Sequence, residues 1–246
     1  MNNKQLNSRP VTLLQRLAFT LVMALLLATF LWLAFWQLDR AEFKQSLLDA
    51  ADTAPTLTVA QIQADSPRFA RIHGAGHYDN ARSFLLDNQV EGGIVGVHLY
   101  TPFQLPGGQW IMVNRGWLAM ALDRKSLPVF TTPTGLTNIS GRLNLPPGTG
   151  VRLGGSEKPA KSALWPKLVT YLELDQLEAE LGISLLPLVI QLDKNSTSGY
   201  GARQLRPLNF GPEKHKGYAI TWFSFAIVAI ILYLVIIPMG RKPEHD

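Results

Sequence analysis

The sequence contains no cysteine, and this absence removes several classes of function at once. Thiolate metal sites, thioester chemistry, redox CxxC motifs and disulfide bonds all require a thiol, so a thiolate-based copper chaperone is excluded. Charge is scarce as well: charged residues make up 17% of the 246 residues, against roughly a quarter in soluble domains. Hydrophobic residues make up 47%. This balance indicates a membrane protein.

Two uncharged apolar segments account for the missing polarity. They cover residues 17–38 and 217–240, and each is long enough to cross a hydrocarbon core of about 30 Å, which takes roughly 20 helical residues. The first segment has a longer apolar core than a signal peptide and no small-x-small cleavage site follows it. Both segments are therefore predicted to be transmembrane helices, the first as a retained anchor.

The charges next to the two segments predict the topology. Lys4, Arg9 and Arg16 precede the first segment without an acidic residue, and Arg241 and Lys242 follow the second. Short basic tails stay in the cytoplasm, so residues 1–16 and 241–246 are expected there and residues 39–216 on the outer side. The net charge of +5 lies largely in these tails, and nucleic acid is not an expected partner. In a bacterium this is an inner-membrane hairpin in the lipid bilayer, with a periplasmic domain.

The central domain has mostly β character. Helix is expected only at 174–181, stopped by Gly182, and at 37–51, where the first membrane helix continues outward. Loops 146–161 and 195–201 are expected to be mobile. Short β-branched or aromatic runs bounded by turn residues lie at 71–78, 83–86, 96–101, 110–113, 136–143, 168–172 and 188–192. The predicted fold is membrane α+β: a hairpin of two transmembrane helices around a mainly antiparallel β domain, as a barrel or sandwich.

Catalytic and metal-binding patterns are weak in this domain. His73 and His77 share one strand face, but four extended residues separate them by about 13 Å, too far to ligate one metal. The glycine-rich run 148–155 lacks the Gly-Lys-Ser/Thr ending of a phosphate loop. No Gly-x-Ser-x-Gly elbow is present. We therefore expect no enzyme.

A polar and aromatic tetrapeptide, Asn114-Arg115-Gly116-Trp117, ends one apolar strand and has two interpretations. In the first it is a structural corner, where the Arg115 guanidinium donates to backbone carbonyls and the Trp117 indole covers the core. In the second, Arg115 pairs with a carboxylate on a ligand or partner. Asn114 and Trp117 then support that surface.

The membrane boundary carries the most informative residues. His215, Tyr218 and Trp222 lie at i, i+3 and i+7, which places them on one stripe of the second helix. Trp36 and Arg40 stand at the outer end of the first helix. An aromatic belt with a basic flank explains this composition. Alternatively, His215 ligates a haem iron. The aromatic residues would then wall the porphyrin, and Arg40 would face the propionates.

Several motifs of the chain resemble, in order, those of the surfeit locus protein 1 family. They are Trp36-Gln-Leu-Asp-Arg40 with Lys44, Asp87-Asn-Gln-Val-x-Gly-Gly, Gly96-x-His98-x-x-Thr-Pro-Phe103, Val113-Asn-Arg-Gly-Trp117 and His215-x-Gly-Tyr-Ala-x-x-Trp-Phe223. Each motif alone is a weak signal. Their succession between two membrane spans, over almost the whole chain, makes the resemblance specific.

The resemblance implies a cytochrome c oxidase assembly factor that handles haem a during its insertion into oxidase subunit I. It implies subunit I and other assembly factors as partners, and the proposed haem ligand of the family falls on His215. Two alternatives stay open. A haem-free scaffold that stabilises an oxidase intermediate would use the same architecture. A periplasmic enzyme or sensor would need a cluster of acid, base or nucleophile, and the sequence offers none.

Overall fold

The computed structural model describes residues 12–121, 124, 126–148, 164–201 and 211–239. Two compact units make up the chain. One unit comprises Met1–Asp49 and Leu208–Asp246 and contains the long helices. The other, Ala50–Pro207, contains the strands.

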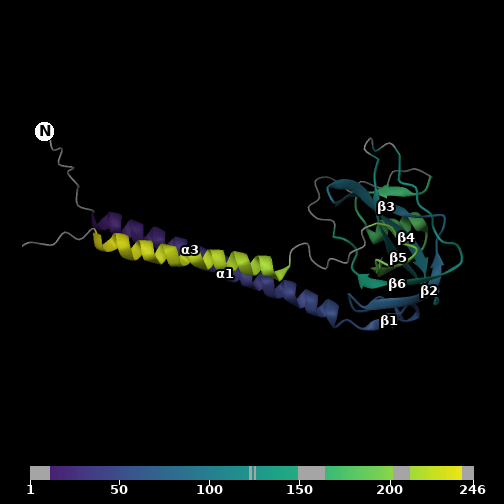
Figure 1. The fold of residues 1–246 in the computed structure, drawn as a ribbon, viewed down its shortest axis with the longest axis horizontal. Coiled ribbons are helices and arrows are strands. Elements are labelled where there is room, and N and C mark those ends of the chain that lie inside the picture. The colour runs from purple at the N-terminus through teal and green to yellow at the C-terminus, as the bar shows by residue number, and fades with distance from the viewer. Residues whose placement is uncertain (1–11, 122–123, 125, 149–163, 202–210, 240–246) are drawn as a thin grey trace, which may run out of the picture. The chain divides into compact units, whose positions relative to one another are not determined.

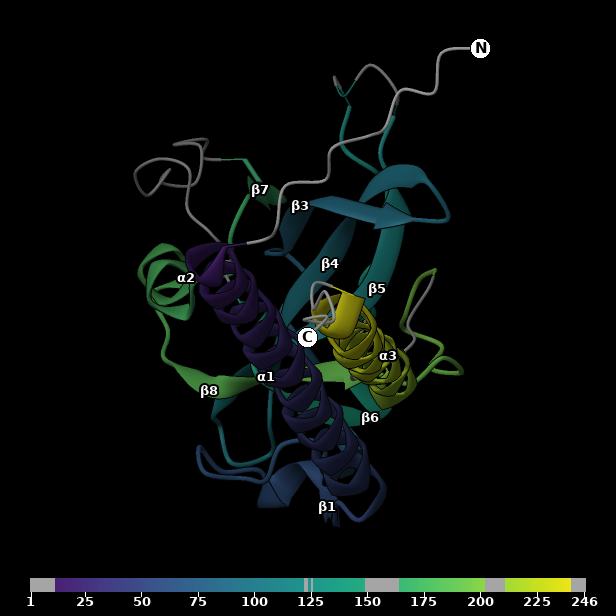
Figure 2. The same cartoon turned by 90° about the vertical axis from the view of Figure 1, so that its left-hand side faces the viewer.

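The first unit is a hairpin of two helices, α1 (Leu13–Asp52) and α3 (Pro212–Met239), which lie side by side in both ribbon views (Figures 1 and 2). Side-chain contacts join Gln37 to His215, Phe30 to Trp222 and Thr20 to Tyr233. Residue numbers fall along α1 as they rise along α3, so the helices are antiparallel. Because α1 contains no glycine or proline, it continues through 37–51 without a break, as predicted.

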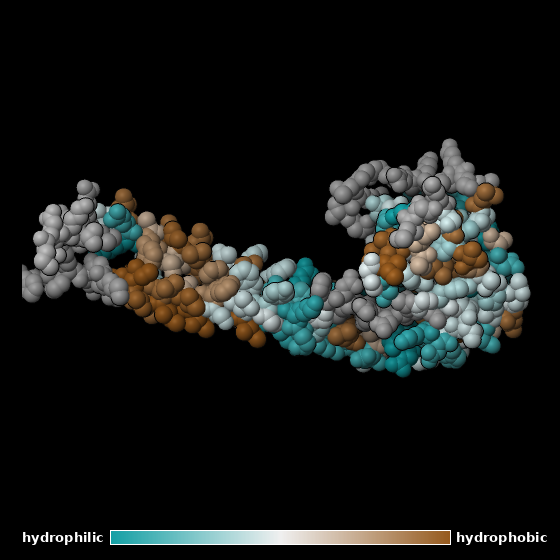
Figure 3. All heavy atoms as spheres, turned by 45° about the horizontal axis from the view of Figure 1, so that its top comes forward, coloured by the Kyte–Doolittle hydropathy of each residue, from teal (hydrophilic) through white to brown (hydrophobic). Residues whose placement is uncertain are grey.

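Small residues occupy the seam between the two helices. Ala34, Ala219 and Ala226 are 0%, 1% and 3% exposed, and their small side chains let the backbones approach closely. Only 6% of the most apolar window of α1 and 11% of that of α3 is buried, so the large apolar side chains point outward. Figure 3 shows the resulting hydrophobic band on the hairpin. Both helices are long and apolar enough to cross a membrane, which supports a membrane protein.

The second unit is a closed barrel with added strands. The sheet order is β1-β2-β6-β8-β5-β4-β3-β7, and a further pairing of β2 with β4, Tyr78 opposite Phe103, closes β2, β6, β8, β5 and β4 into a ring. The strands are β1 (Thr56–Thr58), β2 (Arg71–Tyr78), β3 (Phe84–Glu91), β4 (Ile94–Gln104), β5 (Trp110–Ala119), β6 (Leu136–Asn144), β7 (Lys167–Val169) and β8 (Leu185–Leu192). The remaining elements are a 3-10 turn (Val59–Gln61) and α2 (Leu174–Leu181). The predicted membrane α+β fold is confirmed.

Strand direction is more mixed than the expected meanders. Among the described strands, five pairings are antiparallel and three are parallel. The parallel pairs are β1–β2, β3–β7 and β5–β8. Parallel neighbours need a crossover of a dozen or more residues, and long connections, one of them containing α2, supply it. Strand β1, three residues long, was not predicted.

The barrel core is formed by alternate residues of the ring strands. Phe103, Ile111, Val113 and Ile190 are all fully buried in one cluster to which β2, β4, β5, β6 and β8 contribute. A second cluster on another sheet face contains Met112 and lies under α2. The period-2 alternation along β5 therefore sends neighbouring residues to opposite faces, which determines where its polar residues point.

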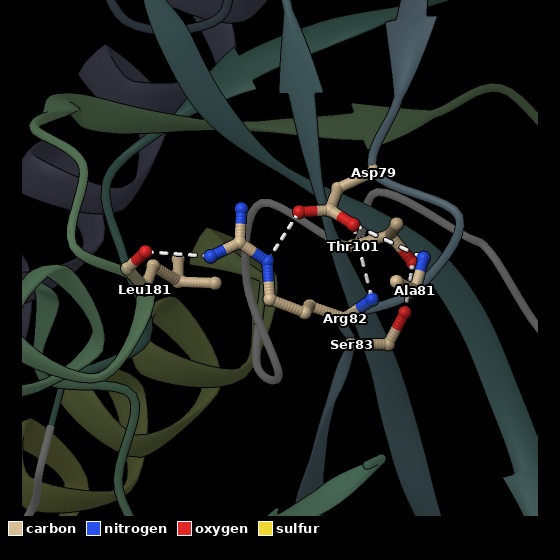
Figure 4. Close-up of polar contacts among 6 residues, drawn as sticks. All are labelled: Asp79, Ala81, Arg82, Ser83, Thr101 and Leu181. Carbon is tan, nitrogen blue, oxygen red and sulfur yellow. Dashed lines mark hydrogen bonds and ion pairs between the residues drawn. The ribbon is translucent and has the colours of Figure 1, made fainter.

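Helix α2 matches its predicted bounds. It ends at Gly182, whose φ of 67° lies in the left-handed region that favours glycine and whose N–H donates to the Glu178 carbonyl. Arg82 then donates to the Leu181 carbonyl at 2.6 Å and is itself held by Asp79 (Figure 4). This arginine satisfies an orphan carbonyl of the helix terminus. It ties α2 to the start of β3.

The structure describes the two segments expected to be mobile to different extents. Most of 146–161 lies outside the described residues. In 195–201, Ser198 is buried and the Tyr200 N–H donates to the Arg115 carbonyl at 2.6 Å. This part of the loop is thus hydrogen-bonded to strand β5, and its mobility stays a prediction.

Candidate functional site

The candidate site in the hairpin centres on His215, in the first turn of α3. Its ring is half-buried, and its Nδ1 lies 2.8 Å from the Gln37 side-chain oxygen Oε1 on α1. An amide oxygen only accepts hydrogen bonds, so with Oε1 as the partner this contact is a hydrogen bond when Nδ1 carries the proton. In a neutral ring the lone pair is then on Nε2. None of the described residues bonds to Nε2, so this nitrogen can bind a metal.

An aromatic cluster lies farther along the same seam. Trp222 stacks on Phe30 with ring centroids 6.0 Å apart and meets Phe225 edge-on at 5.7 Å. Phe30 and Phe225 are themselves 5.8 Å apart. Seven residues of helix place Trp222 about 10 Å from the level of His215. The cluster gives the seam an apolar wall about two helical turns from His215.

The other predicted residues of this site are more exposed. Tyr218 is 58% exposed and Trp36 is 42% exposed. The Arg40 guanidinium lies 5.7 Å over the Trp36 ring, a cation–π contact on α1. His215, Trp222 and the Trp36–Arg40 pair thus have separate partners, and no hydrogen bond, ring contact or cation–π contact between described residues joins these three groups.

Sequence reasoning missed the direct partners of His215 and Trp222. Gln37 lies inside the Trp36–Arg40 motif, in which only Trp36 and Arg40 are predicted to contact haem. Phe30 and Phe225 are two apolar residues among many in the membrane segments. The spacing of Phe30, Ala34 and Gln37, at i, i+4 and i+7, would have placed all three on one face of α1.

In the barrel, Arg115 is 1% exposed and is the largest fully buried side chain. Its Nε donates to the Ser198 carbonyl at 2.7 Å, Nη1 to the Thr132 hydroxyl at 2.9 Å and Nη2 to the Thr131 carbonyl at 2.6 Å. The rings of Tyr78 and Tyr200 flank the guanidinium at 5.1 and 5.2 Å. Burial lowers the pKa of Arg115, and contacts with the two tyrosines oppose this shift.

The Arg115 geometry is that of the structural corner. The guanidinium donates to two backbone carbonyls, and no carboxylate within the described part of the chain pairs with it. The neighbouring Trp117 does not enter the core. Its indole is half-buried, donates to the Gln89 carbonyl at 2.9 Å and lies so close over Gly96 that a Cβ there would come within 2.4 Å of the ring. Position 96 therefore requires glycine, because the Trp117 ring lies too close to its backbone to leave room for a side chain.

Asn114 points to the face opposite Arg115. Its Nδ2 donates to the Tyr100 hydroxyl and to Nδ1 of His98, both at 3.1 Å. Its Oδ1 accepts the Gly116 N–H at 2.9 Å, which fixes the orientation of the amide. A bulge between the pairs Leu99–Gly116 and Tyr100–Asn114 brings these groups together.

Burial determines the electrostatics of this second cluster. It lowers the pKa of His98, partly offset by Glu91, and raises the pKa of Tyr100 above its usual value. Both groups therefore stay neutral at physiological pH. Among the described residues no group of three or more histidine, cysteine, aspartate or glutamate side chains could hold a metal ion. The cluster is a hydrogen-bond network in which Asn114 joins His98, the Tyr100 hydroxyl and the Gly116 N–H.

The motifs that resemble the surfeit locus protein 1 family thus meet in two places. Asp87–Gly93, Gly96–Phe103 and Val113–Trp117 lie on the adjacent strands β3, β4 and β5. The motifs that contain Gln37 and His215 meet across the helix seam.

Comparison with known proteins identifies the family of the chain. The sequence profile of the SURF1 family matches residues 24–227. An uncharacterized SURF1-like protein of Mycobacterium bovis is 25% identical over 235 residues, covering 88% of this chain and 84% of the relative. SURF1-like proteins of Rickettsia felis and Rickettsia conorii are 25% and 26% identical over 213 residues, covering 82% of this chain and 89% and 84% of the relatives. The chain belongs to the SURF1 family, which is generally linked to cytochrome oxidase assembly rather than to an enzymatic activity.

Proposed function

We propose that this protein is a cytochrome c oxidase assembly factor that binds haem a transiently and assists its insertion into oxidase subunit I. Family membership supports the general role. The observation that carries the haem proposal is His215, whose Nδ1–H is bonded to Gln37 while Nε2 has no bond to a described residue. Histidine is a common axial ligand of haem iron, and a second interaction usually orients such a ligand.

The residues around His215 suit a haem. Trp222 with Phe30 and Phe225 forms an apolar wall, and the exposed rings of Tyr218 and Trp36 add aromatic surface at the same end of the hairpin. Arg40 would pair with the propionates. Haem a is the cargo here, so the site has to release it. A single axial histidine serves release better than two.

The proposed location is the bacterial inner membrane, with both termini cytoplasmic and residues 39–216 periplasmic. This topology rests on the basic tails and on the two apolar helices. The β domain would dock subunit I or other assembly factors. The protein itself would carry out no catalysis.

The proposal is tested by the visible spectrum of the full-length protein, purified in detergent from cells that make haem a. Wild type and His215→Ala are compared, with His73→Ala as a matched control because His73 is exposed on β2. We expect haem a in the wild type and in His73→Ala, and its loss in His215→Ala. A haem-free wild type would overturn the carrier function.

A haem-free scaffold is the second candidate. Val90, Ile94 and Val95 are 62%, 55% and 42% exposed on the β3–β4 hairpin, and such an apolar surface favours contact with a protein. In a scaffold, His215→Ala would leave oxidase assembly intact, whereas charged substitutions at Val90 and Ile94 would reduce it. Oxidase levels in cells carrying each variant distinguish the two functions.

A further inference from the structure

We propose that Gln37 is a positioning residue for His215. It selects the ring nitrogen that faces the iron, and as a neutral amide it keeps the ligand weak enough to release its cargo. This inference rests on the proposed function, in which His215 binds haem a. Gln37 itself touches the histidine and not the iron.

The position of Gln37 on α1 gives its amide a defined direction. Ala34 and Ala41, at i−3 and i+4 from Gln37, are 0% and 3% exposed, so this face of the helix lies in the seam. Gln37 is half-buried there, and its Oε1 meets Nδ1 of His215 at 2.8 Å. The two residues are 178 positions apart in the chain. Only the antiparallel register of α1 and α3 brings them together.

This hydrogen bond decides the tautomer. Without a partner, a neutral imidazole can carry its proton on either nitrogen. An amide oxygen accepts only from Nδ1–H, and in the other tautomer the Nδ1 lone pair would face the Gln37 oxygen, so the hydrogen bond would be lost. The ring is therefore held with its lone pair on Nε2, the nitrogen to which no described residue bonds.

The chemical identity of the acceptor also determines the strength of the ligand. A carboxylate at this position would pull the Nδ1 proton and make the imidazole a more basic, stronger ligand. A neutral amide oxygen attracts the Nδ1 proton less and so raises the basicity of the ring less. Gln37 therefore orients the His215 ring but adds little to its strength as an iron ligand. This suits a protein that binds haem and then releases it.

The first test needs no haem. In the full-length apo-protein in detergent micelles, the ¹⁵N shifts of the His215 ring report which nitrogen carries the proton. We expect Nδ1–H in the wild type and a mixture of tautomers in Gln37→Leu and Gln37→Asn, the second of which is too short to reach. Gln45→Leu is the matched control, because Gln45 lies on the same helix and bonds Asp49.

The second test measures binding and release of haem a. Relative to wild type and Gln45→Leu, we expect Gln37→Leu to bind haem a roughly 10-fold more weakly, at the lower end of the range for groups that orient a metal ligand. Gln37→Glu restores an acceptor. It should bind more tightly, lower the haem reduction potential and slow transfer of haem to an acceptor apo-globin.

The outcomes separate the two proposals. An unchanged His215 tautomer and unchanged haem a affinity in Gln37→Leu would overturn the positioning role while leaving the carrier function intact. Faster haem release from Gln37→Glu than from wild type would overturn the argument from acceptor strength. A wild type that takes up no haem a, with His215 still protonated on Nδ1, would overturn the carrier function and the ligand role together.

Discussion

Each unit of the protein contains a histidine whose Nδ1 is hydrogen-bonded to a side-chain amide, and the two amides present opposite groups. In the hairpin, Gln37 offers its oxygen to His215, so that Nε2 holds the lone pair. In the barrel, Asn114 offers its nitrogen to His98, so that Nδ1 holds the lone pair and Nε2 the proton. One arrangement leaves a nitrogen able to bind a metal, and the other uses its lone pair inside the protein.

The two units also differ in how deeply these polar and aromatic residues are buried. Asn114 and Tyr100 of the barrel network are buried, and Arg115 on the other face is almost completely buried. Around His215, Tyr218 and Trp36 are 58% and 42% exposed. The barrel thus uses polar residues for stability, and the hairpin leaves polar and aromatic residues accessible. Substitutions in the two units should therefore have different consequences.

The largest expected effect is on the stability of the barrel in Arg115→Leu. The change leaves the Ser198 and Thr131 carbonyls and the Thr132 hydroxyl without their donor, and we expect the free energy of unfolding to fall by about 3 kcal/mol or more. Denaturant unfolding followed by tryptophan fluorescence measures this. Arg124→Leu, which removes a more exposed ion pair with Asp87, should cost about 1 kcal/mol or less. Equal losses in the two variants would contradict a structural role for Arg115.

A smaller loss is expected in Asn114→Ala. The Gly116 N–H, the Tyr100 hydroxyl and the His98 ring each lose a partner, which should cost about 1–3 kcal/mol in the same unfolding measurement. Asn138→Ala, on an exposed position of β6, should stay within about 0.5 kcal/mol. The haem a spectrum should be unchanged in both variants. Loss of haem from folded Asn114→Ala would break the division between the two units.

Replacing the Asn114 amide by a carboxylate would give His98 an oxygen acceptor at Nδ1, the kind of partner that His215 has. In Asn114→Asp a carboxylate oxygen replaces the Nδ2 donor, so His98 should move its proton to Nδ1, and the pKa of His98 should rise. The ¹⁵N shifts of the His98 ring report the change. Ser140→Asp, on another strand, leaves the His98 partner in place and serves as the control. A His98 that keeps its proton on Nε2 in Asn114→Asp would show that Asn114 does not select the tautomer.

The smallest expected effect is on the pH dependence of barrel stability. Because burial lowers the pKa of His98 in the folded state, the unfolded chain takes up a proton first as the pH falls below about 6.5. The His98 contribution to stability is therefore complete above pH 6.5 and decreases on acidification until the folded-state pKa is reached. In His98→Phe this part of the acid dependence should disappear. A wild type and His98→Phe with parallel stability profiles between pH 7 and pH 5 would contradict it.

Much of the fold could be predicted because its signals are local. The apolar segments, the β-branched runs and the helix stop at Gly182 depend on residues close together in the chain, and strand β2 and helix α2 have the predicted bounds. Strand β1 was missed because a three-residue strand has no periodicity to detect. The parallel pairings were missed because the partner of a strand depends on long connections that leave no local pattern.

The candidate site was only partly predictable for the same reason. His215, Trp222, Trp36, Arg40 and Arg115 stand out by residue type near a boundary or a strand end. Their partners do not. Gln37, the Ser198 carbonyl and the Thr131 carbonyl are ordinary groups that become specific only through position.

The sequence by itself determined that the protein has two apolar helices around a β domain, that thiol chemistry is absent, and which family motifs it carries. Composition and short-range periodicity are sufficient for these features, since hydrophobic burial and backbone preference act on neighbouring residues. Only the tertiary structure decided which amide group meets each histidine. The antiparallel register of α1 and α3 places an oxygen against His215, and the bulge in β4 and β5 places a nitrogen against His98. The choice of tautomer depends on a single atom at hydrogen-bond distance, and that atom comes from a distant part of the chain.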